Sequence, residues 1–336
     1  MDACNEQYNF KRADRHSTIG PLTAPRGKKS DNMAAPFVVT CASGKQATHI
    51  LPHLDGHMPL RLVANSQKSI DRLRAERPRA EVVQADLAQP DECRRVLAGA
   101  AGVLHIGPSF HAHETEIGYN MVDAAAGEAA KPGGAFKHFV YSSVLHPQFR
   151  KMMNHDGKRL VEEYLLESGV PFTILQPTHF LDLFPVGALV GQERPVYHAN
   201  WDTSVRFSFV TLADLGEAMA RVVMEGARHL YATYELCSTL PLSYDELAAQ
   251  VSRVIGKEIE LKQRPYAEAV EAMLAILFGS ADEVPSRTRD AAERMLLFYN
   301  RRGLVGNPLV LEWLLGRRAT SVAAWAKGKF DEASRG

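Results

Sequence analysis

The stretch "FVVTCASGKQATHIL", residues 37–51, runs from a short apolar segment through a turn of small residues into a helical pattern. β-Branched residues before the turn predict a strand, and apolar residues at helical spacing after it predict a helix. The spacing G-x-x-G-x-x-G is filled by Cys41, Gly44 and Ala47. The turn therefore keeps one of the three glycines expected at this kind of strand-to-helix junction.

Glycines at such a junction have a defined physical role when the turn binds a dinucleotide. They allow a tight turn, close approach of the backbone to pyrophosphate and close helix packing, while the helix N-terminus stabilises negative charge. Ala47 adds one methyl group to the packing position and is a mild change. Cys41 is the serious change, because the first position often requires a residue without Cβ. The motif alone leaves open a strand, turn and helix that bind no ligand.

The pattern after residue 37 alternates strands with helices as far as residue 177. This alternation predicts βαβ units and a parallel sheet, because a parallel crossover needs a covering helix. We expect the strand at 171–177 to close a doubly wound sheet. Strands are predicted at 37–41, 60–65, 80–87, 102–107, 137–144 and 171–177, and helices at 47–56, 69–78, 91–100, 114–130 and 158–169.

Beyond residue 184 the alternation breaks, with strands predicted at 206–210, 233–238 and 258–265, a capped helix at 243–256 and mostly helix over 266–330. The predicted fold is therefore α/β, a Rossmann-type doubly wound parallel sheet with a smaller C-terminal α/β lobe. We assign residues 36–184 to the Rossmann domain, with some return of chain after residue 205, and residues 185–336 to the lobe. Residues 1–35 are predicted to be a disordered extension on which function does not depend.

Composition limits the classes of partner. The 39 basic residues balance 39 acidic ones, so the net charge gives no argument for nucleic acid or an anionic membrane. Four widely spaced cysteines indicate a reducing setting. No run approaches the roughly 18 to 20 apolar residues of a membrane span. We expect a cytoplasmic protein, or a nuclear one if it is a regulator.

Two further positions bear on the choice of dinucleotide. After the second strand, "LVANSQK" carries no Asp or Glu for the ribose hydroxyls of NAD, and Asn65, Ser66 and Lys68 are suited to the 2′-phosphate of NADP. A polar turn explains Asn65 and Ser66 equally well. Asp86 follows the third strand, where it could accept a hydrogen bond from adenine, or act as a helix N-cap.

Five segments together resemble the NmrA-like family of atypical short-chain dehydrogenases: "VTCASGKQATHIL", "ADLAQPDECRRVLAGAAGV", "HFVYSSV", "NHDGKRLVEEYLLESGVPFTILQPTHFLDLF" and "GNPLVLEWLLGRRATS". The resemblance runs from about residue 37 to residue 330. It implies a Rossmann domain with a small C-terminal lobe and a cleft between them. Cys41 and Ser43 depart from the threonine-glycine-alanine-threonine-glycine that the family usually has.

The resemblance also implies positions for cofactor contact. Lys158 would reach the nicotinamide ribose, and residues 179–182 would lie beside the nicotinamide. NADP(H) is the implied cofactor, with NAD less favoured. The implied contact positions are Thr40, Ala42, Ser43, Gly44, Lys45, Gln46, Asn65, Lys68, Asp86, Leu87, Ile106, Gly107, Lys158, His179, Phe180, Leu181 and Asp182.

The proton donor of an ordinary short-chain dehydrogenase is missing. Such enzymes carry Tyr four residues before the Lys, but Asn154 occupies that position here, and Asn is no general acid at neutral pH. His155 and His179 are candidate donors because histidine titrates near neutrality. A solvated loop position for His155 and a hydrogen-bonded cleft position for His179 are the alternatives. Tyr141 and Ser142 also lie nearby in the sequence pattern.

The segment "HIGPSFHAHE" gathers His105, His111, His113 and Glu114, but no second cluster completes a metal site, and we predict none. The first functional hypothesis is an NADP(H)-dependent oxidoreductase that reduces a small or specialised-metabolite carbonyl, enone or quinone, in secondary metabolism. The second is a catalytically inert dinucleotide sensor that binds a transcription factor or another protein partner.

Overall fold

Seven parallel strands form the central sheet of the computed structural model, which describes residues 34–279, 281 and 284–335. The strand order β11-β6-β5-β4-β1-β2-β3 reverses direction between β1 and β4, the switch point of a doubly wound sheet. The predicted Rossmann-type α/β fold is confirmed. The strands are β1 (Phe37–Val39), β2 (Leu60–Ala64), β3 (Glu81–Gln84), β4 (Gly102–Ile106), β5 (His138–Ser142), β6 (Phe172–Pro177) and β11 (Ala232–Leu236).

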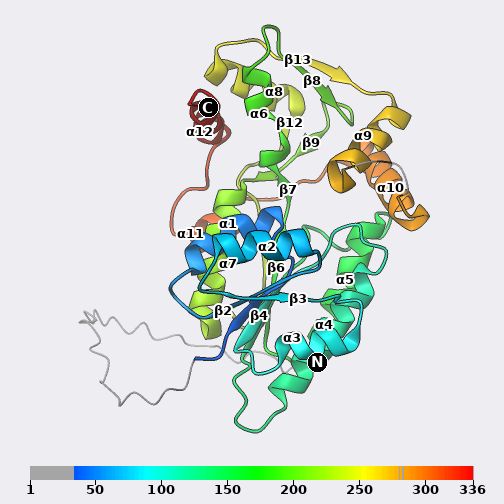
Figure 1. Ribbon diagram of the computed structural model, residues 1–336. Coiled ribbons are helices and arrows are strands. Elements are labelled where there is room, and N and C mark those ends of the chain that lie inside the picture. Colours follow the sequence, from blue (N-terminus) through cyan, green and yellow to red (C-terminus); the bar gives the residue numbers. More distant parts are fainter. Residues whose placement is uncertain (1–33, 280, 282–283, 336) are drawn as a thin grey trace, which may run out of the picture. The chain divides into compact units, whose positions relative to one another are not determined.

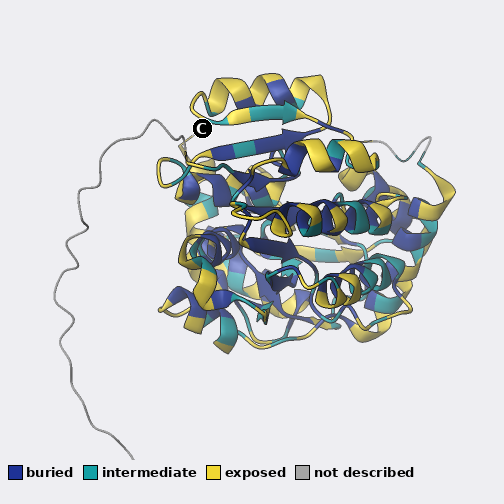
Figure 2. Cartoon of the chain, turned by 90° about the horizontal axis from the view of Figure 1, so that it is seen from below, coloured by how far each residue is buried: buried dark blue, intermediate teal, exposed yellow. Residues whose placement is uncertain are grey.

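Helices cover both faces of this sheet (Figure 1). Successive strand residues point to opposite faces, so Val39 packs into one core and Val38 into the other. On one side lie α1 (Lys45–Leu54), α2 (Gln67–Glu76), α7 (Leu212–Glu225) and α11 (Leu309–Leu315). On the other lie α3 (Pro90–Leu97), α4 (Glu114–Ala129) and α5 (Met153–Glu167). Figure 2 shows the resulting layers, with buried strands between helices whose outer faces are exposed.

One prediction about the sheet is wrong. β6 does not close it, because β11 pairs parallel to β6 from Ala232 opposite Thr173 to Leu236 opposite Pro177. The chain thus returns to the sheet after residue 205, through α7 and β11. The described residues from Ala34 onward form a single unit by their contacts, and the boundary placed at residue 184 stays a prediction.

The remaining elements surround a third hydrophobic core, which includes Trp201, Phe207 and Tyr299. Short strand pairs join in this region: β7 with β10, β8 with β13 and β9 with β12. The strands are β7 (His179–Phe180), β8 (Val196–Ala199), β9 (Arg206–Phe207), β10 (Phe209–Val210), β12 (Leu242–Ser243) and β13 (Glu260–Gln263). The helices are α6 (Val186–Val190), α8 (Tyr244–Ile255), α9 (Tyr266–Phe278), α10 (Ser286–Arg302) and α12 (Val322–Ala333), with 3₁₀ turns at Leu181–Leu183 and Gly226–His229.

Local signals in the sequence place several helix ends. Ser243 and Glu246 form a complete capping box, which explains why the predicted capped helix begins there.

α1 and α7 pack closely because α7 carries a glycine at the crossing. A Cβ on Gly216 would lie 2.3 Å from the carbonyl oxygen of His49. This contact fixes α1, the helix that follows the turn at residues 40–44.

The extension predicted at residues 1–35 lies, up to residue 33, outside the described residues. Within the described part of the chain, no helix has the length and apolar character needed to cross a membrane.

Candidate functional site

A cavity of about 300 Å³ opens at the carboxyl ends of β1 to β4, where the strand order reverses. Ligands of doubly wound α/β proteins bind in the crevice at this position. The lining comes from the carboxyl end of β2, from the segments that follow β1, β2, β3 and β4, and from the first turns of α2 and α4. The lining residues are Cys41, Ser43, Gly44, Val63, Ala64, Asn65, Ser66, Ser69, Ala85, Asp86, Leu87, Pro108, His111 and Ile117.

The turn after β1 leads directly into α1, whose N-cap is Gly44. No side chain caps this helix end, so the first N–H groups of α1 have no partner within the helix and can receive an anion. Gly44 has an extended backbone that any residue could adopt. Glycine is favoured there by space instead, because a Cβ would lie 3.1 Å from the Cys41 carbonyl oxygen.

Cys41 has a positive φ of 46°, in the left-handed region that favours glycine. The position where the turn departs from the glycine pattern is therefore the one that requires glycine-like geometry. Burial, with a smaller contribution from Glu114, raises the pKa of the Cys41 thiol to about 11. The thiol is thus uncharged at neutral pH and does not repel an anion in the turn.

Replacing Cys41 with glycine is expected to raise the free energy of unfolding by about 0.5 to 1 kcal/mol. Relief of left-handed strain outweighs the greater chain freedom of glycine in the unfolded state. Urea denaturation measures the change. Ser43→Gly is the matched control, since Ser43 lies outside the left-handed region and should be destabilised by the same substitution. Equal effects at the two positions would contradict the assignment of strain to Cys41.

The rim at the end of β2 carries positive charge. Ser66 caps α2 by accepting a hydrogen bond from the Ser69 N–H, and Lys68 is exposed on the first turn of that helix. Arg72 lies one turn after Lys68 and donates from Nη2 to the Ser43 carbonyl oxygen at 2.6 Å. Sequence reasoning missed Arg72, although its i, i+4 spacing from Lys68 places the two cations on one helix face.

Asp86 and Leu87 both line the cavity, after β3. The alternative that Asp86 caps the next helix is wrong, since the N-cap of α3 is Gln89. Asp86 instead accepts a hydrogen bond from the Ala88 N–H at 3.0 Å, closing a local turn. Its carboxylate is exposed at the cavity wall, and its contact with adenine stays a prediction.

Two other residues that were predicted to contact the cofactor form hydrogen bonds within the chain instead. Thr40 is buried, and its Oγ1 accepts from the Ile106 N–H at 2.9 Å, so β1 and β4 are tied together beneath the turn. Gln46 accepts a hydrogen bond from Ser142 Oγ at 2.8 Å. Lys45 begins α1 and is exposed, whereas Ala42 is buried.

Lys158 forms an ion pair with Glu114, and only 8% and 9% of the two side chains are exposed. The Nζ to Oε1 distance is 2.6 Å. Glu114 Oε2 also accepts from the Phe110 N–H at 3.1 Å, which ties the loop after β4 to the pair. Gly107 leaves room for the pair, because a Cβ there would lie 3.3 Å from Glu114 Oε1. Sequence reasoning placed Glu114 only in a candidate metal cluster and missed it as the partner of Lys158.

The structure contradicts the position expected for His155, whereas His179 is hydrogen-bonded, as its alternative predicted. His155 lies in α5, fully buried, with Nδ1 3.1 Å from the His146 carbonyl oxygen and Nε2 3.4 Å from the Tyr299 hydroxyl. Its solvated loop position is therefore wrong. His179 Nε2 lies 3.0 Å from the Tyr244 hydroxyl, among aromatic rings.

Burial lowers the pKa of each of these histidines to about 4. The premise that they titrate near neutrality is wrong, because both pKa values lie well below 7. Tyr141 is no better as a donor at neutral pH, since burial raises its pKa well above the usual value of 10.0.

Residues 180–182 face protein as well. Leu181 is buried in the third core, and Phe180 packs against the core that α1 shares. Asp182 Oδ2 accepts from the Leu212 N–H at 2.8 Å, at the start of α7. The side chains of Leu181 and Asp182 thus have structural partners, and contact of this segment with a nicotinamide stays a prediction.

The four candidate metal ligands of the segment "HIGPSFHAHE" do not converge on one point. His105 is buried beside Thr40, and burial lowers its pKa to about 3. His111 and His113 lie with ring centroids 5.8 Å apart, and Glu114 is paired with Lys158. Within the described part of the chain, no group of three or more metal-ligating side chains is placed to hold an ion.

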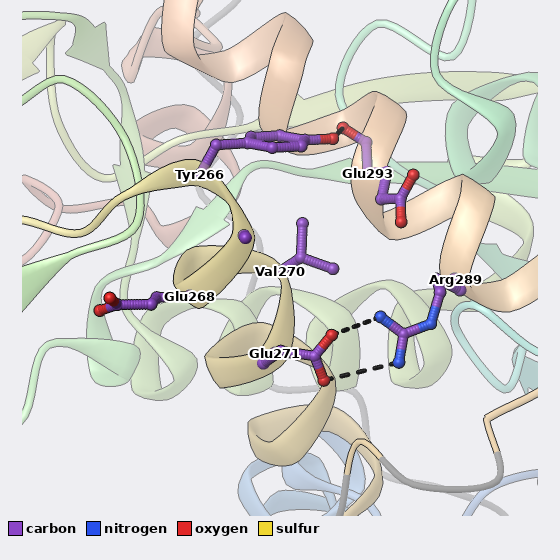
Figure 3. A pocket seen from close by; sticks show the side chains of 7 residues that line it. Tyr266, Glu268, Val270, Glu271, Arg289 and Glu293 are labelled. Carbon is purple, nitrogen blue, oxygen red and sulfur yellow. Dashed lines mark hydrogen bonds and ion pairs between the residues drawn. The ribbon is translucent and has the colours of Figure 1, made fainter.

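A second hollow, of about 540 Å³, lies between α9 and α10, far along the chain from the strand ends (Figure 3). Arg289 and Glu271 form an ion pair of 2.5 Å across it. The Tyr266 hydroxyl donates to the Glu293 carbonyl oxygen at 3.2 Å. Because these contacts join the two helices, we interpret the hollow as a gap in their packing and assign it no function.

The strand order, the turn before α1 and the cavity at the switch point together define a Rossmann protein of the dinucleotide-binding type. The chain belongs to the NmrA-like family, whose model matches residues 34–331. The predicted family is confirmed.

Similar proteins include both enzymes and a regulator. Quinone oxidoreductase 2 of Escherichia coli is 23% identical over 289 residues, which is 85% of this chain and 96% of that protein. Its NADPH complex has a TM-score of 0.70 at 21% identity, covering 88% of this chain and 99% of the other. Triphenylmethane reductase of Citrobacter sp., solved with NADP(H), has a TM-score of 0.68 at 21% identity, covering 89% and 99%. NmrA, a negative transcriptional regulator solved with NAD, has a TM-score of 0.70 at 16% identity, covering 90% and 97%.

Proposed function

We propose that this chain binds NADP(H) in the cavity at the switch point and reduces a small carbonyl compound, enone or quinone. The observation that carries the proposal is the cavity itself, with an uncapped helix N-terminus on one side and Arg72 bonded to the Ser43 carbonyl oxygen of its lining. Lys68 is exposed on the same face of α2 as Arg72. The α1 terminus would hold the pyrophosphate. The two cations, with no carboxylate at the end of β2, favour a 2′-phosphate.

The bound cofactor would supply a hydride, and the residues of this chain would position and enclose the reactants. Lys158 is buried next to Gly107 and would hold the ribose on the nicotinamide side. Similarity to quinone oxidoreductase 2 and to triphenylmethane reductase supports this reaction class, because both of those proteins are reductases. Cytoplasmic location and a role in secondary metabolism remain part of the proposal.

One observation favours a second function, a dinucleotide sensor with a protein partner. His155 is buried, His179 is half-buried among aromatic rings, and both have a pKa lowered to about 4, while Asn154 occupies the position of the usual Tyr, so none of these groups is a proton donor of matched pKa. A regulator in the same family shares the fold. We place the enzyme first because a quinone that accepts a hydride can take its proton from water.

Oxidation of NADPH, followed at 340 nm with a panel of quinones, enones and aldehydes, tests the choice. We expect turnover with at least one acceptor and slower turnover with NADH. Lys68→Gln should reduce the preference for NADPH by about 10-fold, the loss of one charged hydrogen bond. Lys137→Gln, at the amino end of β5, is the matched control and should leave the preference unchanged.

Two results would contradict the proposal in different ways. NADPH binding without turnover across the whole panel would favour the sensor. Equal affinity for NADPH and NADH, or no binding of either, would remove the cofactor assignment.

A further inference from the structure

A small cavity of about 140 Å³ lies between the loop after β4 and the N-terminal turns of α4, α5 and α10. Its wall combines apolar and polar groups. His111 lines both this cavity and the one at the strand ends, so the two spaces adjoin. The loop after β4 contributes Phe110 to the lining, α4 contributes Glu114, α5 contributes Asn154 and α10 contributes Ala291.

Asn154 is the unusual polar group in this wall. Its Oδ1 is buried and has no hydrogen-bond partner among the described residues. Among the described residues, Nδ2 donates to a thioether, Met295 Sδ, at 3.5 Å, and sulfur is a weak acceptor. The side chain as a whole is half-buried, and an amide that lacks good partners costs free energy. A ligand oxygen that accepts from Nδ2 would replace this weak contact with a full hydrogen bond.

Position relates Asn154 to the proposed chemistry. It lies one turn before Lys158 on α5, and residues at i and i+4 share a helix face. Lys158 in turn holds Glu114, which lines the same small cavity. The amide is therefore within one helical turn of the group assigned to the cofactor ribose.

The wall opposite α5 is held rigidly. Phe110 has a positive φ of 64°, a strained conformation for an aromatic residue. Its N–H donates to Glu114 Oε2, and its carbonyl oxygen accepts from Thr288 Oγ1 at 2.8 Å. Contacts from α4 and α10 thus fix the loop from both sides, which is how a binding wall keeps its shape.

Resting on the proposed function, we propose that this cavity receives a single-ring quinone and that the Asn154 amide binds the quinone oxygen that becomes a hydroxyl. A cavity of roughly 150 Å³ is large enough for benzene, so a cavity of about 140 Å³ has room for one six-membered ring, and its polar lining suits a ring that carries oxygens. Asn154 Nδ2 donates to this oxygen as negative charge develops on it. A bound NADPH would supply the hydride and water the proton, so that the quinone would become a hydroquinone and the cofactor NADP⁺.

Asn154→Leu tests the assignment because stability and activity should move in opposite directions. We expect kcat/KM for a single-ring quinone to fall on the order of 100-fold, as when a donor to a developing oxyanion is removed. The melting temperature should stay the same or rise, since leucine removes an unsatisfied polar group. Affinity for NADPH should change less than about 2-fold. Asn154→Ser, which keeps a small donor and acceptor, should retain more turnover than Asn154→Leu.

A binding measurement tests the role of Asn154 independently of quinone turnover. Calorimetry with phenol, on protein saturated with NADP⁺, should show binding to the wild type and none to Asn154→Leu. Ala291→Leu, which fills the cavity, should also abolish phenol binding. A two-ring or three-ring quinone should be a poorer substrate than a single-ring one.

The outcomes are distinguishable. If the wild type turns over quinones and Asn154→Leu does so equally well, the inference is wrong while the proposed function stands. If the wild type lacks turnover but binds phenol through Asn154, the proposed reaction is wrong and the binding cavity stands. A lower melting temperature together with reduced NADPH affinity in Asn154→Leu would indicate a structural role and overturn the assignment.

Discussion

Glu114→Ala is expected to lower the free energy of unfolding by about 3 to 5 kcal/mol, because it leaves the ammonium of Lys158 buried without its counter-ion. Both side chains are more than nine-tenths buried, so water cannot replace the lost partner. The substitution also removes the acceptor of the Phe110 N–H. Urea denaturation at pH 7 measures the loss.

The control for this prediction is a double replacement. Lys158→Met alone should also be strongly destabilising, since the Glu114 carboxylate is then unpaired. Glu114→Ala combined with Lys158→Met should cost less than the sum of the two single changes, because neither charge remains. Additive losses would show that the two residues act independently and would contradict the ion pair as the source of the effect.

Asp214→Ala is expected to cost on the order of 4 kcal/mol, through loss of several hydrogen bonds to one buried carboxylate. Asp214 is fully buried in α7. It accepts from Ser238 Oγ at 2.8 Å, from the Thr320 N–H at 2.8 Å and hydroxyl at 2.7 Å, and from Arg317 Nη2 at 2.9 Å. These contacts join α7, the end of β11 and the segment between α11 and α12.

The same carboxylate predicts a pH dependence. Burial raises the pKa of Asp214, but hydrogen bonds from Thr320, Ser238 and Arg317 outweigh burial, so the pKa lies below its usual value of 3.8. Because the pKa of Asp214 is lower in the folded than in the unfolded chain, its carboxylate contributes fully to the free energy of unfolding above about pH 4. That contribution is lost as the pH falls through the pKa of the folded state. Denaturation between pH 7 and pH 3 should therefore show a steeper loss in the wild type than in Asp214→Asn.

The exposed Asp331 provides the matched control for Asp214. It pairs with Lys327 on the surface of α12, and such pairs contribute little. Asp331→Asn should change the free energy of unfolding by less than about 0.5 kcal/mol. A comparable loss at the two positions would show that burial of Asp214 does not determine its contribution.

Local patterns were sufficient to predict most elements of the sheet, because each strand and its covering helix are adjacent in the chain. The helix after Ser243 was predictable from its capping box alone. β11 was recognised as a strand but not as part of the sheet. Its pairing with β6 joins segments far apart in sequence, and no local pattern encodes that partner.

The candidate site likewise has features that local sequence patterns predict and features that depend on contacts between distant segments. The turn at residues 40–44 and the polar end of β2 were visible in the sequence, and both line the cavity. The pairing of Glu114 with Lys158 was not visible, because it depends on how α4 packs against α5. The lowered pKa of His179 was also inaccessible, since its burial comes from Trp201, Phe207 and Tyr299, which arrive from distant segments.

The interleaving of late segments with the sheet has a consequence for synthesis of the chain on the ribosome. The sheet lacks its edge strand until residue 236 has been made, and Asp214 lacks two of its partners until residue 320. Residues 34–184 therefore cannot complete their native packing as they emerge, although N-terminal domains often fold first during translation. A nascent chain halted before residue 309 would leave the α7 face of the sheet without α11, exposing apolar surface to chaperones.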